Sequence, residues 1–126
     1  MEQQLFEENG ETLIIYLPGE LDHHVAGAIR EKTESLFICK KVRDVIFDYT
    51  NTHFMDSSGI GLVMGRYREV RYLKGDVYIV GVNDKVARIL DISGLYRVAK
   101  RCKDVDTALQ DIKEKNKKRA MAGSQI

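Results

Sequence analysis

Short apolar runs alternate with amphipathic helical patterns along most of this chain. Runs typical of buried strands occupy residues 12–17, 44–49 and 77–80, and the segments that follow them repeat apolar residues at helical spacing. Strands that alternate with helices normally form a mostly parallel sheet covered by those helices. With 126 residues, the chain suits a single domain with one core. The alternation therefore predicts an α/β fold.

Turn and cap residues place the ends of the expected elements. A strand over residues 3–8 leads into Asn9-Gly10, a hairpin turn that adds an antiparallel pair. Gly75 is expected to stop the second helix, and a short edge strand is expected over Tyr96–Ala99. We expect helix caps at Asp22, at Ser57 or Ser58, at Asn83 or Asp84, and at Asp104 or Asp106. The predicted domain, over residues 1–112, has a mixed, mostly parallel sheet of four to five strands with about four helices.

The chain ends in a basic segment over residues 113–126. Lysine or arginine stands at positions 113, 115, 117, 118 and 119. We interpret the segment as a frayed or disordered tail outside the domain, whose solvated cations suit a helix C-terminus. An anionic partner is the alternative that this charge cluster allows.

Composition and charge exclude several classes of protein. The formal net charge of +1 gives no field that would draw the chain to nucleic acid or to a membrane. No apolar run approaches the ~20 residues of a membrane-spanning helix, and the first residues lack the pattern of a secretion signal. Cys39 and Cys102 lie far apart in sequence and are expected to be reduced thiols. We therefore expect a cytoplasmic protein.

The segment Phe54–Gly61 places two serines beside a carboxylate at the start of the second expected helix. A helix N-terminus offers free N–H groups and a partial positive charge. A serine there can cap the helix, attack a substrate or accept a phosphoryl group. Ser57 is expected to expose its hydroxyl, whereas Ser58 sits deeper and is better placed to cap. Gly59 and Gly61 keep the surface open for the backbone of a partner.

Catalytic and nucleotide-binding interpretations of this loop lack the residues that they require. A hydrolase elbow reads Gly-x-Ser-x-Gly, but Met55 and Asp56 stand two places before the serines. A Walker loop needs a lysine after its final glycine, and leucine follows Gly61. We therefore expect no catalytic residue and no cofactor.

A second polar segment carries Glu20 and Asp22 before two adjacent histidines. Adjacent helical residues point about 100° apart, so His23 and His24 are poorly placed to ligate one ion, and we expect no metal site. If the strands before Asp22 and Asp56 are neighbours, both helices open on the same edge of the sheet. The carboxylates and serines would then share one recognition surface.

The middle of the second expected helix carries a short mixed segment. Tyr67 fits the apolar stripe and is expected in the core. Arg66 and Arg68 are expected to be solvated, and a partner contact by Arg66 stays open.

The two polar segments together resemble a known family. Residues 19–24, Gly-Glu-Leu-Asp-His-His, and residues 54–67, which end in Gly-Arg-Tyr, are similar to the anti-sigma factor antagonists of the STAS domain class, most closely its sporulation members. Asp91–Leu95 resembles the ending of the third helix in that class. The resemblance runs from about residue 5 to residue 112, so it implies a single STAS-like domain.

The resemblance implies a binding protein and not an enzyme. Members of this class bind an anti-sigma factor that is also an ATP-dependent serine kinase, and they thereby release a sigma factor. The kinase phosphorylates the first serine of the Asp-Ser-Ser-Gly motif, which is Ser57 here, and a metal-dependent serine phosphatase restores the active form. We expect a monomer. The expected partner surface comprises Glu20, Asp22, His23, His24, Asp56, Ser57, Ser58, Gly59, Gly61 and Arg66.

Three alternatives stay open at this point. General-stress members of the class more often carry a threonine after the phosphorylated serine and lack the His-His pair. A STAS-type scaffold would act without phosphorylation. Outside the class, a small enzyme would use Ser57 with a nearby histidine.

Overall fold

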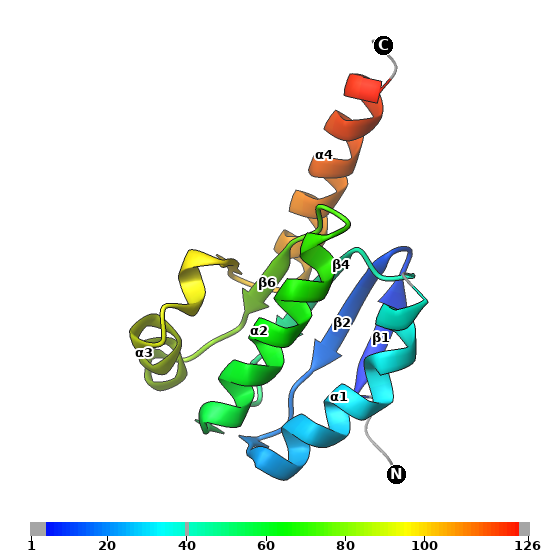
Figure 1. Cartoon of the computed structure of the whole chain (residues 1–126). Helices are drawn as coiled ribbons and strands as arrows, with labels where there is room; N and C mark the ends of the chain where they lie inside the picture. Colours follow the sequence, from blue (N-terminus) through cyan, green and yellow to red (C-terminus); the bar gives the residue numbers. More distant parts are fainter. Residues whose placement is uncertain (1–4, 40, 124–126) are drawn as a thin grey trace.

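The computed structural model describes residues 5–39 and 41–123, and a five-stranded sheet forms its centre (Figure 1). The strands lie in the order β1-β2-β4-β6-β7, with β1 antiparallel to β2 and the remaining neighbours parallel. The predicted mixed, mostly parallel sheet is therefore confirmed, although residues 3 and 4 of the first expected strand lie outside the described ranges. The strand bounds are Phe6–Asn9 for β1, Thr12–Tyr16 for β2, Asp44–Asp48 for β4, Val77–Val80 for β6 and Ala99–Cys102 for β7.

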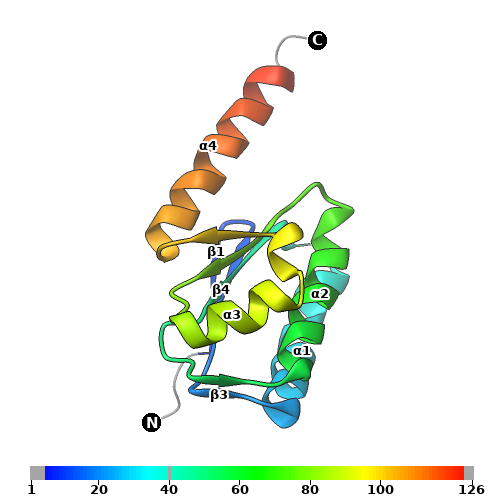
Figure 2. The same ribbon diagram turned by 90° about the vertical axis from the view of Figure 1, so that its left-hand side faces the viewer.

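Helices cover both faces of this sheet. Three of them, α1 (His23–Ile38), α2 (Ser57–Arg71) and α3 (Asp84–Ile92), lie on one face, and α4 (Val105–Gly123) lies on the other (Figure 2). Each of the first three connects two neighbouring parallel strands, which requires a crossover of this kind. None of the helices in the described part of the chain is long and apolar enough to cross a membrane.

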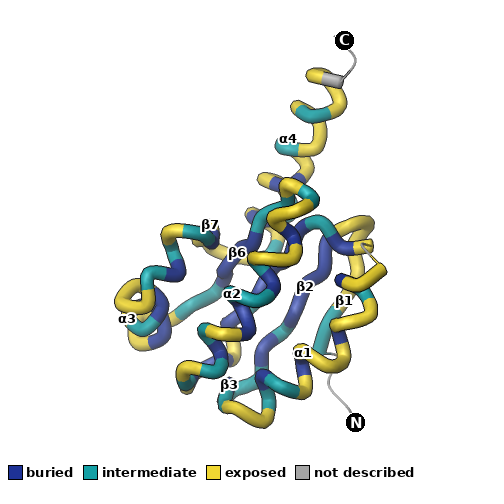
Figure 3. The backbone as a smooth tube through the Cα atoms, in the orientation of Figure 1, coloured by how far each residue is buried: buried dark blue, intermediate teal, exposed yellow. Residues whose placement is uncertain are grey.

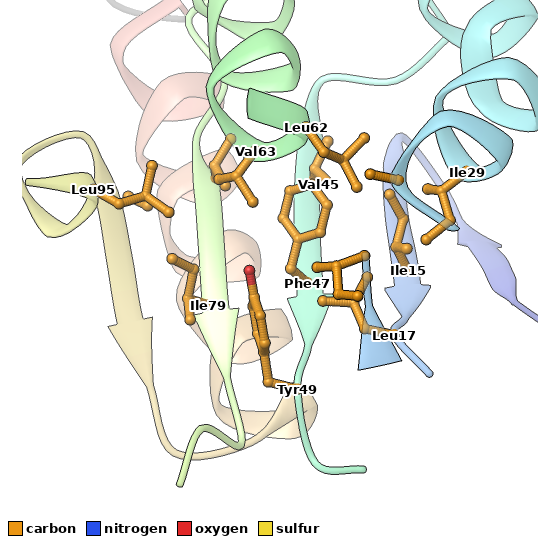
Figure 4. Close-up of a cluster of buried hydrophobic side chains, with 14 of the residues drawn as sticks. Ile15, Leu17, Ile29, Val45, Phe47, Tyr49, Leu62, Val63, Ile79 and Leu95 are labelled. Atoms are coloured by element: carbon orange, nitrogen blue, oxygen red, sulfur yellow. The ribbon is translucent and has the colours of Figure 1, made fainter. Parts of the chain in front are cut away.

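Alternate strand residues supply the two layers of the core. Leu13 and Ile15 of β2 join the core beneath α1 and α2, whereas Ile14 joins the core beneath α4. In Figure 4, Leu62 and Val63 of α2 lie over the sheet, on the face that α1 and α2 cover. Figure 3 shows the consequence: the inner strands β2, β4 and β6 are buried almost throughout, whereas the edge strands and the outer sides of the helices are largely exposed.

The expected edge strand over Tyr96–Ala99 is wrong. A 3-10 turn, η1 (Leu95–Arg97), occupies the first half of that segment, and the edge strand β7 begins only at its last residue, Ala99. Gly94 has a φ of 79°, a conformation that favours glycine, and the chain turns there. The turn directs the side chain of Leu95 into the core, where it is 1% exposed. Lys100 and Arg101 of β7 are exposed, so this strand carries no apolar pattern from which the sequence could reveal it.

Gly75 is expected to stop α2, but the helix ends earlier, at Arg71, and the glycine is required for a different physical reason. The residue in the left-handed conformation is Lys74, with a φ of 59°. A Cβ atom on Gly75 would lie 1.6 Å from the carbonyl oxygen of Arg43, so only glycine fits against that neighbouring backbone. The Gly75 N–H also donates to the carbonyl of Val70 over 2.9 Å, which satisfies one of the last helical carbonyls.

The basic C-terminal segment is helical through residue 123, and two of its cations are not solvated as expected. Lys115 is paired with Asp44 and lies 3.0 Å from the carboxylate of Asp76, at the N-terminal ends of β4 and β6. Arg119 donates to the backbone carbonyl of Lys74. Through these contacts, the part of α4 that follows residue 112 is held against the start of β4 and the turn before β6. Residues 124–126 lie outside the described ranges, and a domain boundary at 112 stays a prediction.

A candidate recognition site at two helix N-termini

Two short strands bring distant parts of the chain together below the main sheet. β3 (Glu20–Leu21) and β5 (Phe54–Met55) form a parallel pair that the sequence analysis did not predict as strands. Leu21 is the register partner of Met55, and the Asp56 N–H donates to the Leu21 carbonyl over 3.2 Å. The two predicted helix starts are therefore neighbours, and α1 and α2 begin side by side (Figures 1 and 2).

Each of these helices begins at an aspartate cap. The Asp22 side chain accepts a hydrogen bond from the Val25 N–H over 3.0 Å, as predicted. In α2 the cap is Asp56, which accepts from the Ser58 N–H over 2.8 Å, so the prediction of a serine cap is wrong. Both carboxylates complement the positive ends of their helices. Neither Ser57 nor Ser58 is needed for capping.

The two serines differ in exposure, as predicted. Ser57, the first residue of α2, is exposed, whereas Ser58 is half-buried. The Ser57 hydroxyl makes no hydrogen bond to any other residue in the described ranges, so it is open to a reagent from solution. An accessible hydroxyl thus stands at the positive end of a helix, beside a carboxylate.

The two glycines of the loop have different roles. A Cβ atom on Gly59 would lie 2.5 Å from Met55 Cγ and 3.0 Å from Leu21 Cδ2, so this glycine lets α2 pack directly on the β3–β5 pair. A Cβ atom on Gly61 would meet nothing within 4 Å, and this residue is exposed. Only Gly61 therefore behaves as the open surface position predicted for it.

The α1 side of the site is polar and exposed. Glu20, His23 and His24 are all exposed, and the two imidazole rings lie 5.6 Å apart in an edge-on arrangement. No group of three or more possible metal-binding side chains occurs among the residues that the structure describes. Phe54 on β5 is 45% exposed at the same place, a feature that the sequence analysis passed over. Its sequence signal is an aromatic residue directly before the Met-Asp-Ser-Ser run.

Arg66 does not belong to this exposed surface, and the prediction that it is solvated is wrong. Its side chain is 3% exposed, and it donates to the Arg30 carbonyl and to the Thr33 hydroxyl of α1 over 2.8 and 2.9 Å. Its other terminal nitrogen lies 2.7 Å from the carboxylate of Glu69. Burial lowers the pKa of the guanidinium, and Glu69 opposes that effect. Arg66 therefore ties α1 to α2 from within.

Comparisons with known proteins identify the family of this chain. The family described as the STAS domain matches residues 3–108. The chain is 35% identical to an anti-sigma F factor antagonist of Paenibacillus polymyxa over 92 residues. This alignment covers 73% of this chain and 79% of that protein. The chain is 37% identical over 95 residues to an anti-sigma F factor antagonist of Lysinibacillus sphaericus, with 75% and 81% covered.

A solved structure shares the fold. The structure of the Bacillus cell fate determinant SpoIIAA in its phosphorylated form matches with a TM-score of 0.70 and 31% sequence identity. The match covers 85% of this chain and 96% of that chain. The fold of this chain is therefore shared with that protein.

Proposed function

This chain belongs to the STAS domain family, and we propose that it is an anti-sigma factor antagonist controlled by phosphorylation of Ser57. In its unphosphorylated form it binds an anti-sigma factor that is also an ATP-dependent serine kinase. Binding releases the sigma factor that the kinase holds. A metal-dependent serine phosphatase removes the phosphate and restores the binding form, and the exchange takes place in the cytoplasm.

The observation that carries this proposal is the free Ser57 hydroxyl at the start of α2. A kinase needs an accessible hydroxyl, and Ser57 is exposed while Asp56 performs the capping. The first-turn N–H groups of α2 and the positive helix end suit a phosphate, which can be held without a change of fold. Ser57 also lies beside the start of α1, because β3 pairs with β5. A phosphate on Ser57 would therefore affect the surface that the two helix starts share.

Phosphate at Ser57 would weaken the partner complex through charge. It adds about −1.5 to −2 charge at neutral pH, next to Asp56 and near Asp22 of the adjacent helix start. Crowding of like charges then acts on the partner and leaves the apolar core untouched. A loss of about 3–4 kcal/mol at the interface weakens binding several-hundredfold, enough for a switch.

The proposed partner surface lies around the two helix starts, where most residues are exposed or half-buried and Gly59 is buried beneath them. It keeps the predicted residues other than Arg66 and adds Phe54, because an exposed aromatic ring is a common binding anchor. Arg66 is left out because its guanidinium is buried and engaged within the molecule. The surface comprises Glu20, Asp22, His23, His24, Phe54, Asp56, Ser57, Ser58, Gly59 and Gly61.

We assign the switch to a sporulation sigma factor and not to a general-stress one. The support is that both relatives described above are named antagonists of an anti-sigma F factor. The adjacent His23 and His24, and serine rather than threonine at position 58, fit the same branch. Deletion of the gene followed by spore counts separates the two pathways.

Intact-mass spectrometry with peptide mapping tests the proposal. The protein is incubated with ATP and a cognate anti-sigma factor kinase, and we expect a gain of one phosphate on Ser57. A Ser57→Ala variant is the matched control and should gain none. Phosphate on Ser58 in that variant would move the site by one residue. No phosphate on the unaltered protein, with a kinase proven active on another substrate, would leave a STAS domain that does not switch.

A further inference from the structure

The C-terminal ends of α1 and α2 lie side by side, at the opposite end of α2 from Ser57 (Figure 1). Residues at and just after these ends line an apolar groove. Its volume is about 410 Å³, within the ~300–1,000 Å³ typical of binding pockets. Phe37 and Val42 are buried at its base, and the half-buried Leu73 lines it from the turn after α2. None of the residues proposed for the switch lines this groove.

Two large apolar side chains stand exposed on the walls of the groove. Tyr72 is 89% exposed and Ile38 is 70% exposed. Tyr72 follows the last residue of α2, where a polar side chain would end the helix equally well. Single exposed apolar residues are normal on a protein surface. Here two of them line the same apolar groove, and exposed apolar side chains that gather at one place are a feature of interaction sites.

Positively charged residues lie along one side of the groove. Arg68, Arg71 and Lys74 are exposed, and together with Tyr72 they line a second hollow of about 620 Å³ that adjoins the groove. Glu69 also lines the groove, but its carboxylate is held 2.7 Å from the buried Arg66 guanidinium, which offsets its charge. The rim of the groove therefore favours an acidic ligand.

The groove is fixed before any ligand arrives. The Arg66 guanidinium lies 4.3 Å from the centre of the Phe37 ring, which forms part of the groove base. Its hydrogen bonds to the Arg30 carbonyl and to Thr33 hold α2 against α1. A binding surface that is already ordered loses less entropy when it is filled.

We propose that this groove binds an acidic amphipathic helix of a partner protein. The apolar side of that helix packs between Ile38 and Tyr72, and its carboxylates face Arg68, Arg71 and Lys74. The larger hollow beside β7 has no such preference, because both cations and carboxylates line it. The proposal is independent of the phosphorylation switch, since its surface lies at the other end of α2.

A stapled helical peptide serves as the probe. It has about 14 residues, with leucine at positions i, i+3, i+4 and i+7, glutamate at the remaining positions, and a fluorescent label. Fluorescence anisotropy measures its Kd for the whole protein. We expect saturable binding that weakens as salt rises. A peptide of the same composition in scrambled order, and one with lysine in place of glutamate, should each bind at least about tenfold more weakly.

Surface variants separate the two contributions to binding. Tyr72→Ser removes an apolar wall, and the double variant Arg68→Glu with Arg71→Glu reverses the rim charge. Each should raise the Kd at least about tenfold. Ile92→Ser, which removes a 79% exposed isoleucine from α3, is the apolar control, and Lys117→Glu with Lys118→Glu is the charge control. Ser57→Asp should leave the Kd unchanged.

Three outcomes would overturn the proposal. The first is no saturable binding of the leucine–glutamate peptide at low salt. The second is equal binding by the groove variants and their controls, which would show that the peptide binds elsewhere. The third is a concentration-dependent dimer, seen by sedimentation equilibrium, that Tyr72→Ser abolishes. That result would assign the groove to a second copy of this chain.

Discussion

Leu21 lies opposite Met55 in the β3–β5 pair, and the residue after each of them caps a helix. This single register places Asp22 and Asp56 at adjacent helix starts, although more than thirty residues separate them in the sequence. Gly59 is buried against both partners, so the pair also supports the first turn of α2. The accessibility of Ser57 follows from this arrangement, because Asp56 satisfies the first-turn N–H group that a serine would otherwise bind.

The first prediction concerns the charge at Ser57. Ser57→Asp should weaken binding to the anti-sigma factor kinase by at least about tenfold, because it adds a carboxylate beside Asp56 and near Asp22. Ser57→Ala should keep wild-type affinity and should not lose it on incubation with ATP. Isothermal titration calorimetry measures both. Equal affinities for the two variants would remove charge at this position from the mechanism.

The second prediction separates the two glycines of the loop. Gly59→Ala should lower the free energy of unfolding by about 1–3 kcal/mol, because its Cβ collides with the buried Met55 and Leu21 side chains. Gly61→Ala, where the Cβ meets open space, should raise that free energy by up to about 1 kcal/mol through better helix propensity. Urea unfolding measures both. A destabilised Gly61→Ala variant would contradict the open-surface assignment.

Much of the fold was predictable because its elements carry strong patterns. The buried residues of β2, β4 and β6 form continuous apolar runs, and Asn9-Gly10 is a specific hairpin signal. The short β3 and β5 could not be found in this way, since two residues show no periodicity. The cap of α2 was ambiguous because aspartate and serine cap helices almost equally well.

Arg66 was misplaced although a signal for its burial existed. It lies three residues after Val63 and four before Val70, on the buried stripe of α2. The charge of the side chain argued for solvent, and only the folded structure supplies the Arg30 carbonyl and the Thr33 hydroxyl that make its burial tolerable. A charged residue on an otherwise apolar stripe is therefore better treated as a candidate buried donor.

The third prediction tests that burial. Arg66→Ala should lower the free energy of unfolding by about 2–3 kcal/mol, because it removes the packing over Phe37 and the hydrogen bonds to α1. Arg68→Ala, two residues along the same helix and exposed, should change it by no more than about 0.5 kcal/mol. Chemical denaturation followed by circular dichroism compares the two. Similar small effects would mean that Arg66 is solvated after all.

The last prediction is a pH dependence that arises where α4 meets the sheet. Burial alone would raise the pKa of Asp76, but hydrogen bonding and charge from Lys115, with Lys100, outweigh it and lower the pKa. Because the folded-state pKa is below that of the unfolded chain, this carboxylate stabilises the fold above about pH 4, and the contribution disappears as the pH falls through the folded-state value. Asp76→Asn should therefore be less stable than wild type near neutral pH, by about 1 kcal/mol for a pair near the surface.

The difference between wild type and Asp76→Asn should shrink as the pH is lowered from about 7 to about 3, measured by urea unfolding at each pH. Lys115→Met should also be less stable than wild type near neutral pH, and by more than Asp76→Asn, since it removes the cation that pairs with both Asp76 and the buried Asp44. Asp91→Asn is the control, because Asp91 is exposed on α3 and has no ion pair within the described ranges. A gap between wild type and Asp76→Asn that stays constant with pH would show that the Lys115 contact does not hold α4 to the sheet.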